Sequence, residues 1–490
     1  MKRIVSILML TAMLLGLCAC GKESGDDSEI VATRPAPTVQ VVEGQAIEQL
    51  DNVSVYFGVS GNSQTLEDLP AYTYNGDVAV KFKQMGDGRY GEKNYVFSDT
   101  DAAAYINYLN ALEIDGWVQY SNNIIEGTNL FATYTKGTQS VYCYYISSKK
   151  TTYIIKSLNQ NLEPREKDNQ YETVCTPILT QTMLQYIEWP AGMGYIIRLA
   201  DGRFILIDGG YMESNGKESE RLYAILERQN VLDKITIAAW FITHAHGDHL
   251  GVTNEFMMKY KPEDVEIQQF IFNFPNNEDL EVADPIVVND TNNPTRMPTF
   301  FLVKDMLWKD VPVTVCHTGQ VYHFADAKME VIHTYEDFYP KKIYQTGQDP
   351  VNGSTSVVRF EIAGQTTMFY GDASIGASAD MVSMWGSYLK SDIMQANHHG
   401  LNGGSVPLYE NTDPTVVMVP SSAREIPSIL RFEYSRWIWN NKSGNIKEVM
   451  LSGWGHRELD LPYKVTDDTP FFPKDVKDPW YGKAADYKEK

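Results

Sequence analysis

The sequence has few cysteines and few positive charges, and both shortages narrow the classes of protein it can belong to. Five cysteines occur in 490 residues, and beyond Cys20 only Cys143, Cys175 and Cys316 remain, far apart. This spacing excludes a disulfide framework and a CxxC metal site. Lysine and arginine number 42 against 63 aspartates and glutamates, which gives a net charge of -21. Such an acidic surface repels nucleic acid, so a nucleic-acid-binding protein is disfavoured.

Long apolar runs are also missing, apart from one at the N-terminus. Two basic residues precede an apolar stretch over residues 4–17, which is too short to span a bilayer and predicts a secretory signal over residues 1–19. The stretch ends in LCACG, which resembles the lipobox of bacterial lipoproteins, where a small residue precedes a lipid-modified cysteine. Cys20 follows Ala19 and is the expected lipidation site, with an ordinary signal peptide as the alternative. We expect a lipid-anchored protein on the extracytoplasmic face of a bacterial cell membrane.

Changes in composition divide the rest of the chain. Residues 20–46 are polar and predict a flexible tether. Residues 47–160 combine strand patterns with one helix pattern, in which Tyr105, Ile106, Leu109 and Leu112 share a face and Gly116 is the expected stop. These residues predict a small α+β domain of unknown role, whose many aromatic strand residues favour ordinary sheet packing over a ligand surface. A polar linker follows at residues 159–170, then strands alternating with helices over residues 171–466 and a tail at 467–490.

Most of the chemistry is concentrated where one buried strand pattern ends. The apolar run ITIAAWFIT leads directly into HAHGDH, which contributes His244, His246, Asp248 and His249. With nine histidines in the chain, this spacing has a low risk of being a chance match. Neutral imidazoles and carboxylates are ligands that suit zinc, so the motif predicts a metal site.

HAHGDH resembles the metallo-β-lactamase superfamily, whose hallmark is HxHxDH. One motif before it in the sequence and two after it add to the resemblance. Asp208 in LIDGG, Asp372 in MFYGDAS and His399 in NHHG match the family's other conserved positions, and the resemblance covers roughly residues 175–465. The stretch NGSTSVVRFEIAGQTTMFYGDAS followed by SDIMQANHHG looks like the ComEC branch and the bacterial phosphorylcholine esterases. The resemblance implies an α/β fold, a four-layer αββα sandwich, preceded here by the small α+β domain.

The resemblance also implies roles for these residues. One divalent ion would be held by His244, His246 and Asp372, and a second by Asp248, His249, Asp372 and His399. Zinc is expected, and Mn2+ or Fe2+ are alternatives. Asp208 would orient the histidines without binding metal. His398, beside the ligand but facing another way, is the candidate for contacting the substrate oxyanion or protonating the leaving group, and Asp248 is counted with it as catalytic. Which of His398 and His399 binds metal stays open.

Many superfamily hydrolases have a further histidine that completes the first metal site, and this sequence offers only weak candidates for it. His333, at the end of MEVIH, is the best of the three in the interval, ahead of His317 and His323, although an ordinary hydrogen-bonding role is favoured. The ComEC-like branch lacks this ligand too, which implies a more open first site. His456 is a second candidate for the border of the cleft.

These observations predict a metal-dependent hydrolase, with a phosphomonoester or phosphodiester of an extracytoplasmic small molecule or cell-surface polymer as the expected substrate. A ComEC-like nuclease is the alternative, opposed by the acidic charge. A non-catalytic surface-binding lipoprotein is another. The Asn, Asp and Pro content of residues 276–299 predicts a loop over the cleft, where substrate selectivity is expected to reside.

Overall fold

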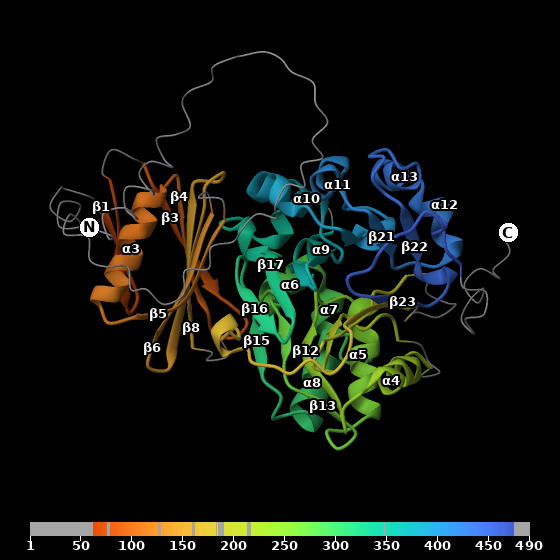
Figure 1. Cartoon of the computed structure of the whole chain (residues 1–490). Coiled ribbons are helices and arrows are strands. Elements are labelled where there is room, and N and C mark those ends of the chain that lie inside the picture. The colour runs from red at the N-terminus through yellow and green to blue at the C-terminus, as the bar shows by residue number, and fades with distance from the viewer. Residues whose placement is uncertain are drawn as a thin grey trace, which may run out of the picture.

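The structure is a computed structural model that describes residues 62–75, 79–125, 129–158, 162–182, 184, 191–212, 217–346 and 349–474. Figure 1 shows a sheet with one helix, near the N-terminus, beside a larger unit of sheets and helices. The predicted signal peptide, the tether and Cys20 lie outside the described residues. No helix within the described part of the chain is long and apolar enough to cross a membrane.

The N-terminal unit is a six-stranded antiparallel sheet with the strand order β3-β4-β8-β7-β6-β5, and the separate hairpin β1-β2 packs against its helix α3 through β2. Hydrogen bonds between sequence neighbours dominate this sheet, as the strand and turn pattern of its last third predicts. The strands are β1 (Asn62–Leu66), β2 (Leu69–Tyr74), β3 (Lys81–Asp87), β4 (Lys93–Ser98), β5 (Val118–Ile125), β6 (Asn129–Lys136), β7 (Gln139–Ile146) and β8 (Thr151–Ser157).

Helix α3 (Ala102–Ile114) covers one face of this sheet. Asp101 caps its first turn by accepting a backbone N–H through its side chain. Gly116 follows the helix with φ +86, a left-handed conformation that glycine adopts at low cost. Tyr105, Leu109 and Leu112 are buried in the cluster between helix and sheet.

The second unit contains two larger sheets. One has the order β15-β14-β12-β11-β10-β9-β23, with β13 also paired to β12, and the other has the order β16-β17-β18-β19-β20-β21-β22. The strands of the first sheet are β9 (Ile178–Gln181), β10 (Tyr195–Arg198), β11 (Phe204–Ile207), β12 (Ile235–Phe241), β13 (Val265–Ile267), β14 (Phe270–Phe272), β15 (Val313–Val315) and β23 (Arg457–Asp460). Those of the second are β16 (Val321–Phe324), β17 (Ala327–His333), β18 (Val357–Ile362), β19 (Gln365–Phe369), β20 (Ile393–Gln395), β21 (Val416–Val419) and β22 (Glu448–Leu451).

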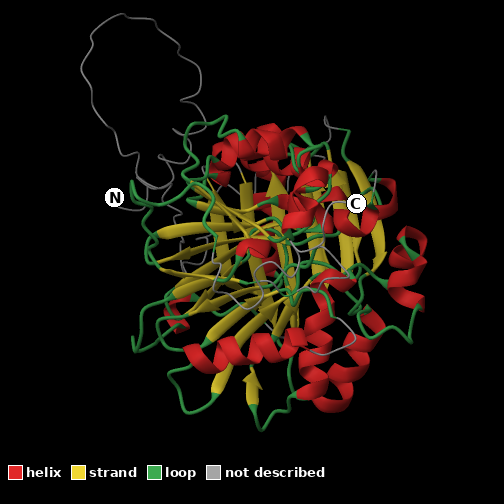
Figure 2. Ribbon diagram, turned by 90° about the vertical axis from the view of Figure 1, so that its right-hand side faces the viewer, coloured by secondary structure: helices red, strands yellow, loops and turns green. Residues whose placement is uncertain are grey.

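Alternation along the strands separates the cores of this unit. Ile205 and Ile207 of β11 share a core cluster with Val358 and Phe360 of β18, so the two sheets face each other. Leu206, between the two isoleucines, belongs instead to the cluster that includes the helices. Figure 2 shows helices above and below the strands. The expected four-layer αββα arrangement is therefore confirmed. The helices are α4 (Lys217–Gln229), α5 (Gly247–Lys259), α6 (Asn277–Ala283), α7 (Pro285–Asn289), α8 (Met297–Leu307), α9 (Pro350–Gly353), α10 (Ile375–Trp385), α11 (Val406–Thr412), α12 (Ile426–Ile429) and α13 (Glu433–Trp439).

The segment over residues 276–299, predicted as a loop, is largely helical. It forms α6, α7 and the start of α8. The residues that suggested a loop stand at helix starts: Asn276 and Asp284 are the N-caps of α6 and α7, and Pro285 and Pro298 occupy the first turns of α7 and α8. Asn, Asp and Pro favour helix starts as well as loops, so composition alone misassigned this segment.

The face of the N-terminal sheet opposite α3 packs against the second unit, and we call this contact the domain seam. Tyr142, Tyr144 and Tyr153 on that face belong to the same core cluster as the helices of the second unit. The ring of Phe131 stacks on that of Trp385, with centroids 5.7 Å apart. The aromatic strand residues therefore serve packing, as expected, and those on the face opposite α3 pack between the two units.

Candidate metal centre

The histidine motif lies where strand β12 passes into helix α5. All seven residues of β12 are buried, and the chain turns after it so that His246 becomes the N-cap of α5. Asp248 and His249 fall in the first turn of the helix, where the exposed backbone N–H groups favour a negative charge such as that of Asp248. Strand end and helix start thus present four potential ligands from six consecutive residues.

Asp208, at the end of β11, holds this turn in place. Its Oδ1 accepts the backbone N–H of Thr243 at 2.7 Å, and its Oδ2 accepts the Thr243 hydroxyl at 2.8 Å. The same Oδ2 lies 2.7 Å from Nδ1 of His249. An ionised carboxylate only accepts, so Nδ1 carries the proton and Nε2 of His249 keeps its lone pair for a metal. The arrangement matches the orienting role that the resemblance implies for Asp208.

The glycines after Asp208 allow this close packing. A Cβ on Gly209 would lie 2.5 Å from the backbone nitrogen of Thr253 in α5, and one on Gly210 would lie 2.0 Å from the carbonyl oxygen of Leu184. Gly209 therefore lets β11 approach the helix that carries the motif, and Gly210 lets the chain pass beside the backbone of Leu184.

Asp372 and His399 come from the second sheet. Asp372 follows β19, and His398 and His399 lie in the short helical turn η5 (Asn397–Gly400) after β20, both with left-handed backbones at φ +48 and φ +56. At a residue other than glycine such a conformation costs about 1–3 kcal/mol, and the surrounding structure must hold it in place. Nδ1 of His399 lies 2.9 Å from the carbonyl oxygen of Pro420. That contact requires a proton on Nδ1 and directs Nε2 at the two aspartates, so Nε2 is the nitrogen that a metal would bind in place of a proton.

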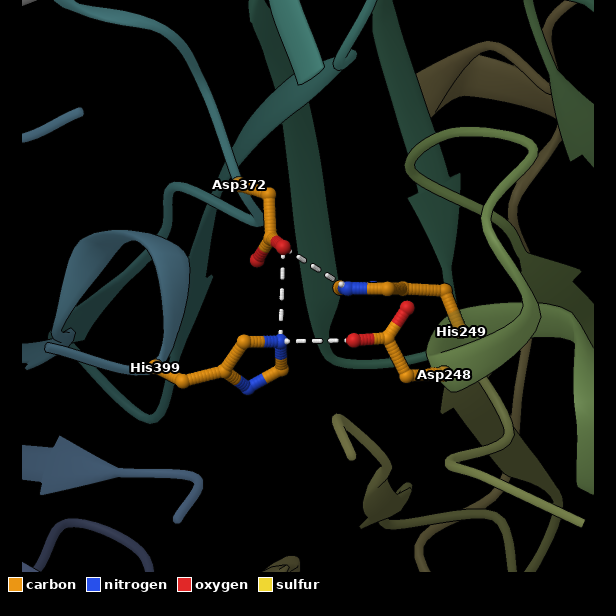
Figure 3. Close-up of side chains that lie close together, drawn as sticks. All are labelled: Asp248, His249, Asp372 and His399. Atoms are coloured by element: carbon orange, nitrogen blue, oxygen red, sulfur yellow. Dashed lines mark ion pairs between the residues drawn. The ribbon is translucent and has the colours of Figure 1, made fainter. Parts of the chain in front are cut away.

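Four of the predicted ligands converge closely (Figure 3). Asp248, His249, Asp372 and His399 each offer a ligand atom, and these atoms lie within 4.8 Å of one another. Nε2 of His249 is 3.2 Å and Nε2 of His399 is 3.3 Å from Oδ2 of Asp372, and Nε2 of His399 is 3.4 Å from Oδ2 of Asp248. The group is the predicted second metal position.

The two remaining histidines of the motif lie beside this group. Nε2 of His244 is 3.1 Å from Nδ1 of His246, and the rings of His244 and His249 have centroids 4.1 Å apart. His244 and His246 are thus next to the four-residue group without belonging to it. Burial, aided by the charge of His249 and His246, lowers the pKa of His244 well below its ordinary value, so this imidazole is neutral, as a ligand must be.

The sequence predicted that His398 faces away from the metal ligands, and this prediction is wrong. Its Nδ1 lies 2.7 Å from the carbonyl oxygen of Asn402, and its Nε2 lies 3.6 Å from Oδ2 of Asp372. Nε2 is also 3.3 Å from Nδ2 of Asn352. Both histidines of the pair therefore direct Nε2 towards Asp372, and His399 is the one that belongs to the four-residue group.

The charges of the group are strongly coupled. Burial by itself would lower the pKa of His399, but the carboxylates of Asp372 and Asp248 outweigh it and raise that pKa to about 10. Burial would likewise raise the pKa of Asp372, yet His399, His249 and His398 lower it well below its ordinary value. Without a metal, the carboxylates hold protons on the imidazoles, which are the sites a cation would take.

The unsatisfied atoms of this group fit a metal ion. Among the described residues, Oδ1 of Asp372 is buried without a hydrogen-bond partner, and Nε2 of His249 and Nε2 of His399 have only their ion-pair contacts to carboxylates at 3.2–3.4 Å. Leaving such groups unpaired is expensive unless something else binds them. Two imidazole nitrogens and two carboxylates are a donor set that suits a divalent metal ion such as zinc.

The weaker candidates lie elsewhere. His333 is fully buried at the end of β17, with Nε2 3.9 Å from Asp337, which belongs to the domain seam. His456 lies beside edge strand β23, with Nε2 2.8 Å from Glu458 and 3.1 Å from Arg228. His317 pairs with Glu336 through Nδ1 at 2.8 Å. None of the three is in the four-residue metal group of the described residues.

The sequence did not predict two residues that hold the candidate ligands and their neighbours in place through hydrogen bonds. Thr243 joins Asp208 to the motif, and Asn352 contacts His398. Thr243 stands directly before the motif, which was a usable signal. Asn352 is the first residue of the stretch NGSTSVVRFEIAGQTTMFYGDAS, but nothing local indicates its role, because its partner His398 is 46 residues away.

One family model matches the part of the chain that contains the histidine motif. The profile of the family described as the metallo-beta-lactamase superfamily matches residues 189–326. None of the curated proteins matches the chain.

Three of the similar solved structures share little sequence with it. CmlA, a diiron beta-hydroxylase from Streptomyces venezuelae, is 11% identical with a TM-score of 0.34, and the match covers 59% of this chain and 55% of CmlA. The metallo-beta-lactamase fold protein YhfI from Bacillus subtilis is 11% identical with a TM-score of 0.33, covering 58% and 99%. A protein of unknown function from Enterococcus faecalis is 12% identical with a TM-score of 0.28, covering 45% and 49%.

The matched residues 189–326 contain the whole HAHGDH motif and the strands that carry it. Asp372 and His399 lie beyond the match, yet the second sheet brings both to the motif. Residues 189–326 of the second unit therefore match the model of the metallo-beta-lactamase superfamily, and the unit brings together a histidine and aspartate group able to hold a divalent metal ion.

Proposed function

We propose that this protein is an extracytoplasmic hydrolase that cleaves phosphoric esters with water activated between two divalent metal ions, most simply zinc. The observation that carries the proposal is the convergence of Asp248, His249, Asp372 and His399, with His244 and His246 alongside. When bound, such ions supply a water whose pKa is lowered from about 16 towards about 7, together with positive charge for the phosphoryl oxygens.

The residues of the chain divide the remaining tasks. Asp372 reaches towards both halves of the site, because its Oδ2 meets His249 of α5, which follows the first sheet's β12, and His399 of η5, which follows the second sheet's β20. Asp208 and the Pro420 carbonyl hold the two imidazoles with Nε2 directed inward. The ligands are thus oriented before any ion arrives, which reduces the reorganisation that binding requires.

His398 is the group that we assign to the substrate. Its Nδ1 is fixed by Asn402, and its side chain is 16% exposed, whereas that of His399 is 1% exposed. An imidazole at the rim of the ligand group can contact a phosphoryl oxygen or give a proton to the leaving group. Asn352, 3.3 Å from Nε2 of His398, orients the same ring.

The choice of a phosphoric ester rests on the resemblance of the NGSTSVV and NHHG stretches to the phosphorylcholine esterase and ComEC branches. A nuclease would share this chemistry, but the net charge of -21 opposes binding of a polyanion. A small phosphoester fits the acidic chain better, and a phosphorylated cell-surface polymer is a candidate through the same resemblance and not through charge.

The direct test is metal content together with hydrolysis of a substrate panel. The chain from residue 21 onwards is assayed with bis-p-nitrophenyl phosphate, p-nitrophenyl phosphate, p-nitrophenylphosphorylcholine, nitrocefin and plasmid DNA. About two ions per chain and turnover of a p-nitrophenyl phosphoester that Asp372→Ala abolishes support the proposal. Turnover of nitrocefin or DNA alone, or no turnover in a metal-loaded chain, rejects it.

The location is a separate proposal, and it rests on the lipobox-like sequence around Cys20. Metabolic labelling with palmitate in a bacterial host tests it with two matched variants. We expect Cys20→Ser to abolish labelling and Cys18→Ser to retain it. Labelling that survives Cys20→Ser, or that is absent from the unaltered chain, rejects the anchor at this residue.

A further inference from the structure

The turn between β3 and β4 projects from the N-terminal unit onto the metal-binding domain. Arg89 lies in this turn, and its Nη2 and Nε donate to the carbonyl oxygen of Pro275 at 2.7 and 3.2 Å. Its guanidinium carbon lies 5.2 Å from the centre of the Phe301 ring in α8. The neighbouring Tyr90 packs against Phe272 of β14, with ring centroids 6.4 Å apart. One arginine therefore contacts both ends of the segment that contains α6 to α8.

The same segment reaches the metal-binding motif from its other side. A Cβ on Gly247, inside HAHGDH, would lie 2.8 Å from Oγ1 of Thr295, just before α8. Nδ2 of Asn254 in α5 donates to the carbonyl oxygens of Pro294 and Arg296 at 2.8 and 3.1 Å. The residues before α8 are thus laid directly on the first two turns of the helix that carries Asp248 and His249.

We propose that the N-terminal unit is a working part of the catalytic domain, and that Arg89 is a positioning residue that fixes residues 275–301 as the wall of the substrate cleft beside the metal motif. This inference rests on the proposed function for its substrate and on the contacts above for its geometry. It assigns the N-terminal unit a role different from a spacer or an independent binding module.

The chemistry of Arg89 suits this role. Its guanidinium is aimed at a carbonyl and an aromatic face, so it positions backbone and not a charged partner. A planar fork of donors can bind one carbonyl twice while its face covers a ring, which lysine cannot reproduce. Removing the side chain would leave α6 to α8 tied to α5 by Asn254 and to the second unit by the Asp279–Lys342 pair, but without the Arg89 contacts to the N-terminal unit.

The experiment compares Arg89→Ala and Arg89→Lys with Arg165→Ala by hydrogen exchange and kinetics. Arg165 is a matched control, because its guanidinium also stacks on an aromatic ring, Tyr120 at 4.3 Å, and pairs with Asp168. In Arg89→Ala, amides of residues 276–296 should exchange about tenfold faster while those of β7 and β18 stay unchanged. KM for bis-p-nitrophenyl phosphate should rise roughly three- to tenfold with kcat little altered.

Arg89→Lys should give intermediate values, since it restores one donor without the fork, and Arg165→Ala should behave like the unaltered chain. Unchanged exchange over residues 276–296, or an increase spread equally over β7 and β18, overturns the positioning role. The exchange readout needs no turnover, so failure of the proposed hydrolase activity is recognised separately. If turnover is present but KM does not move while exchange does, the segment is not the cleft wall and the proposal fails.

Discussion

Asp372 in the metal group and Asp337 at the domain seam are both buried aspartates, but their surroundings differ. Asp337 lies in the short turn η2 (Tyr335–Phe338), and each of its oxygens accepts hydrogen bonds, Oδ1 from Tyr144 and Oδ2 from Thr318 at 3.0 and 2.7 Å. Oδ1 of Asp372 has no partner, and its Oδ2 faces imidazole nitrogens on two sides. The seam carboxylate is satisfied by the protein, whereas the metal-group carboxylate is not.

The pKa directions follow the same division. Burial raises the pKa of Asp337, although His333, Lys149 and Thr318 oppose it. Burial acts the same way on Asp372, but the histidines reverse its effect and lower the pKa. A buried polar group whose partners are all present adds to the stability of the fold, and one that stays incomplete marks a place for something the chain does not contain. Substitution of Asp372 should therefore reduce metal binding and activity, whereas substitution of Asp337 should reduce the stability of the fold.

The largest effect is expected from Asp372→Ala. Losing this carboxylate removes the group that lies between His249 and His399, so metal content should fall and hydrolysis should drop by about 10³-fold or more. Metal analysis and steady-state kinetics measure both, and circular dichroism should show the fold retained. Asp337→Asn is the paired control, for which metal content and kcat/KM should stay near those of the unaltered chain. If the two variants lose activity equally, the distinction between the aspartates is wrong.

Asp337→Ala is expected to lower the free energy of unfolding and not the metal content. This change leaves the hydroxyls of Tyr144 and Thr318 buried without their acceptor, and such a loss costs about 3–5 kcal/mol of unfolding free energy when a charged partner is removed. Urea denaturation of the metal-free chain measures it. Tyr144→Phe, which deletes a single hydrogen bond from the same carboxylate, should cost about 1 kcal/mol. A larger cost for Tyr144→Phe than for Asp337→Ala would contradict this assignment of the seam.

A smaller effect, on metal affinity, is expected at Asp208, which contacts the candidate ligand His249. Asp208→Asn keeps the shape of the side chain but can no longer accept from both Thr243 and Nδ1 of His249 as a carboxylate does, so metal affinity should fall by about 10- to 100-fold. Competition with a coloured chelator measures the affinity. Asp201→Asn, in the turn at the opposite end of the β10-β11 hairpin, is the control and should not change it. Equal affinities for both variants would mean that Asp208 only supports the backbone.

The metal group could be predicted from the sequence to a large extent, because its signals are local. HAHGDH places three histidines and an aspartate between a strand end and a helix start, and Asp208 lies in a strand-and-glycine pattern of its own. The orientation of His398 could not be predicted, since it depends on the left-handed backbone of two consecutive residues and on Asn402 four residues later. Only the folded turn decides where each imidazole points.

The seam could not be predicted, because its partners are far apart along the chain. Tyr144 and Asp337 are separated by 193 positions, and nothing near either residue names the other. All but the first residue of β7 are buried, which indicates cover on both faces of the sheet, but the pattern does not say by what. The helices α6 to α8 were missed for a different reason, since their capping residues have the composition of a loop.

The smallest expected effect is a change in the pH dependence of stability, and it concerns Glu163, a buried carboxyl group between the two units. Its Oε1 accepts from Thr133 of β6 and its Oε2 from Gln320 before β16, at 3.1 and 3.3 Å, and Ser121 also donates to it. Burial raises the pKa of Glu163, although the bonds from Ser121 and Thr133 oppose the rise. An acid with a raised folded pKa stabilises the fold fully below its unfolded pKa, about 4.3, and loses that contribution as pH rises through the folded value.

Glu163→Gln removes this titration while keeping an amide of the same size. Relative to the unaltered chain, the variant should therefore gain stability as pH rises from 4 to 7, and the difference between their urea midpoints at each pH measures the gain. Other groups titrate in both chains and cancel in the difference. A difference that stays flat, or that shrinks towards pH 7, would show that Glu163 is ionised in the folded protein without loss of stability. The contrast between the carboxylates of the seam and of the metal group would then not extend to the segment that joins the two units.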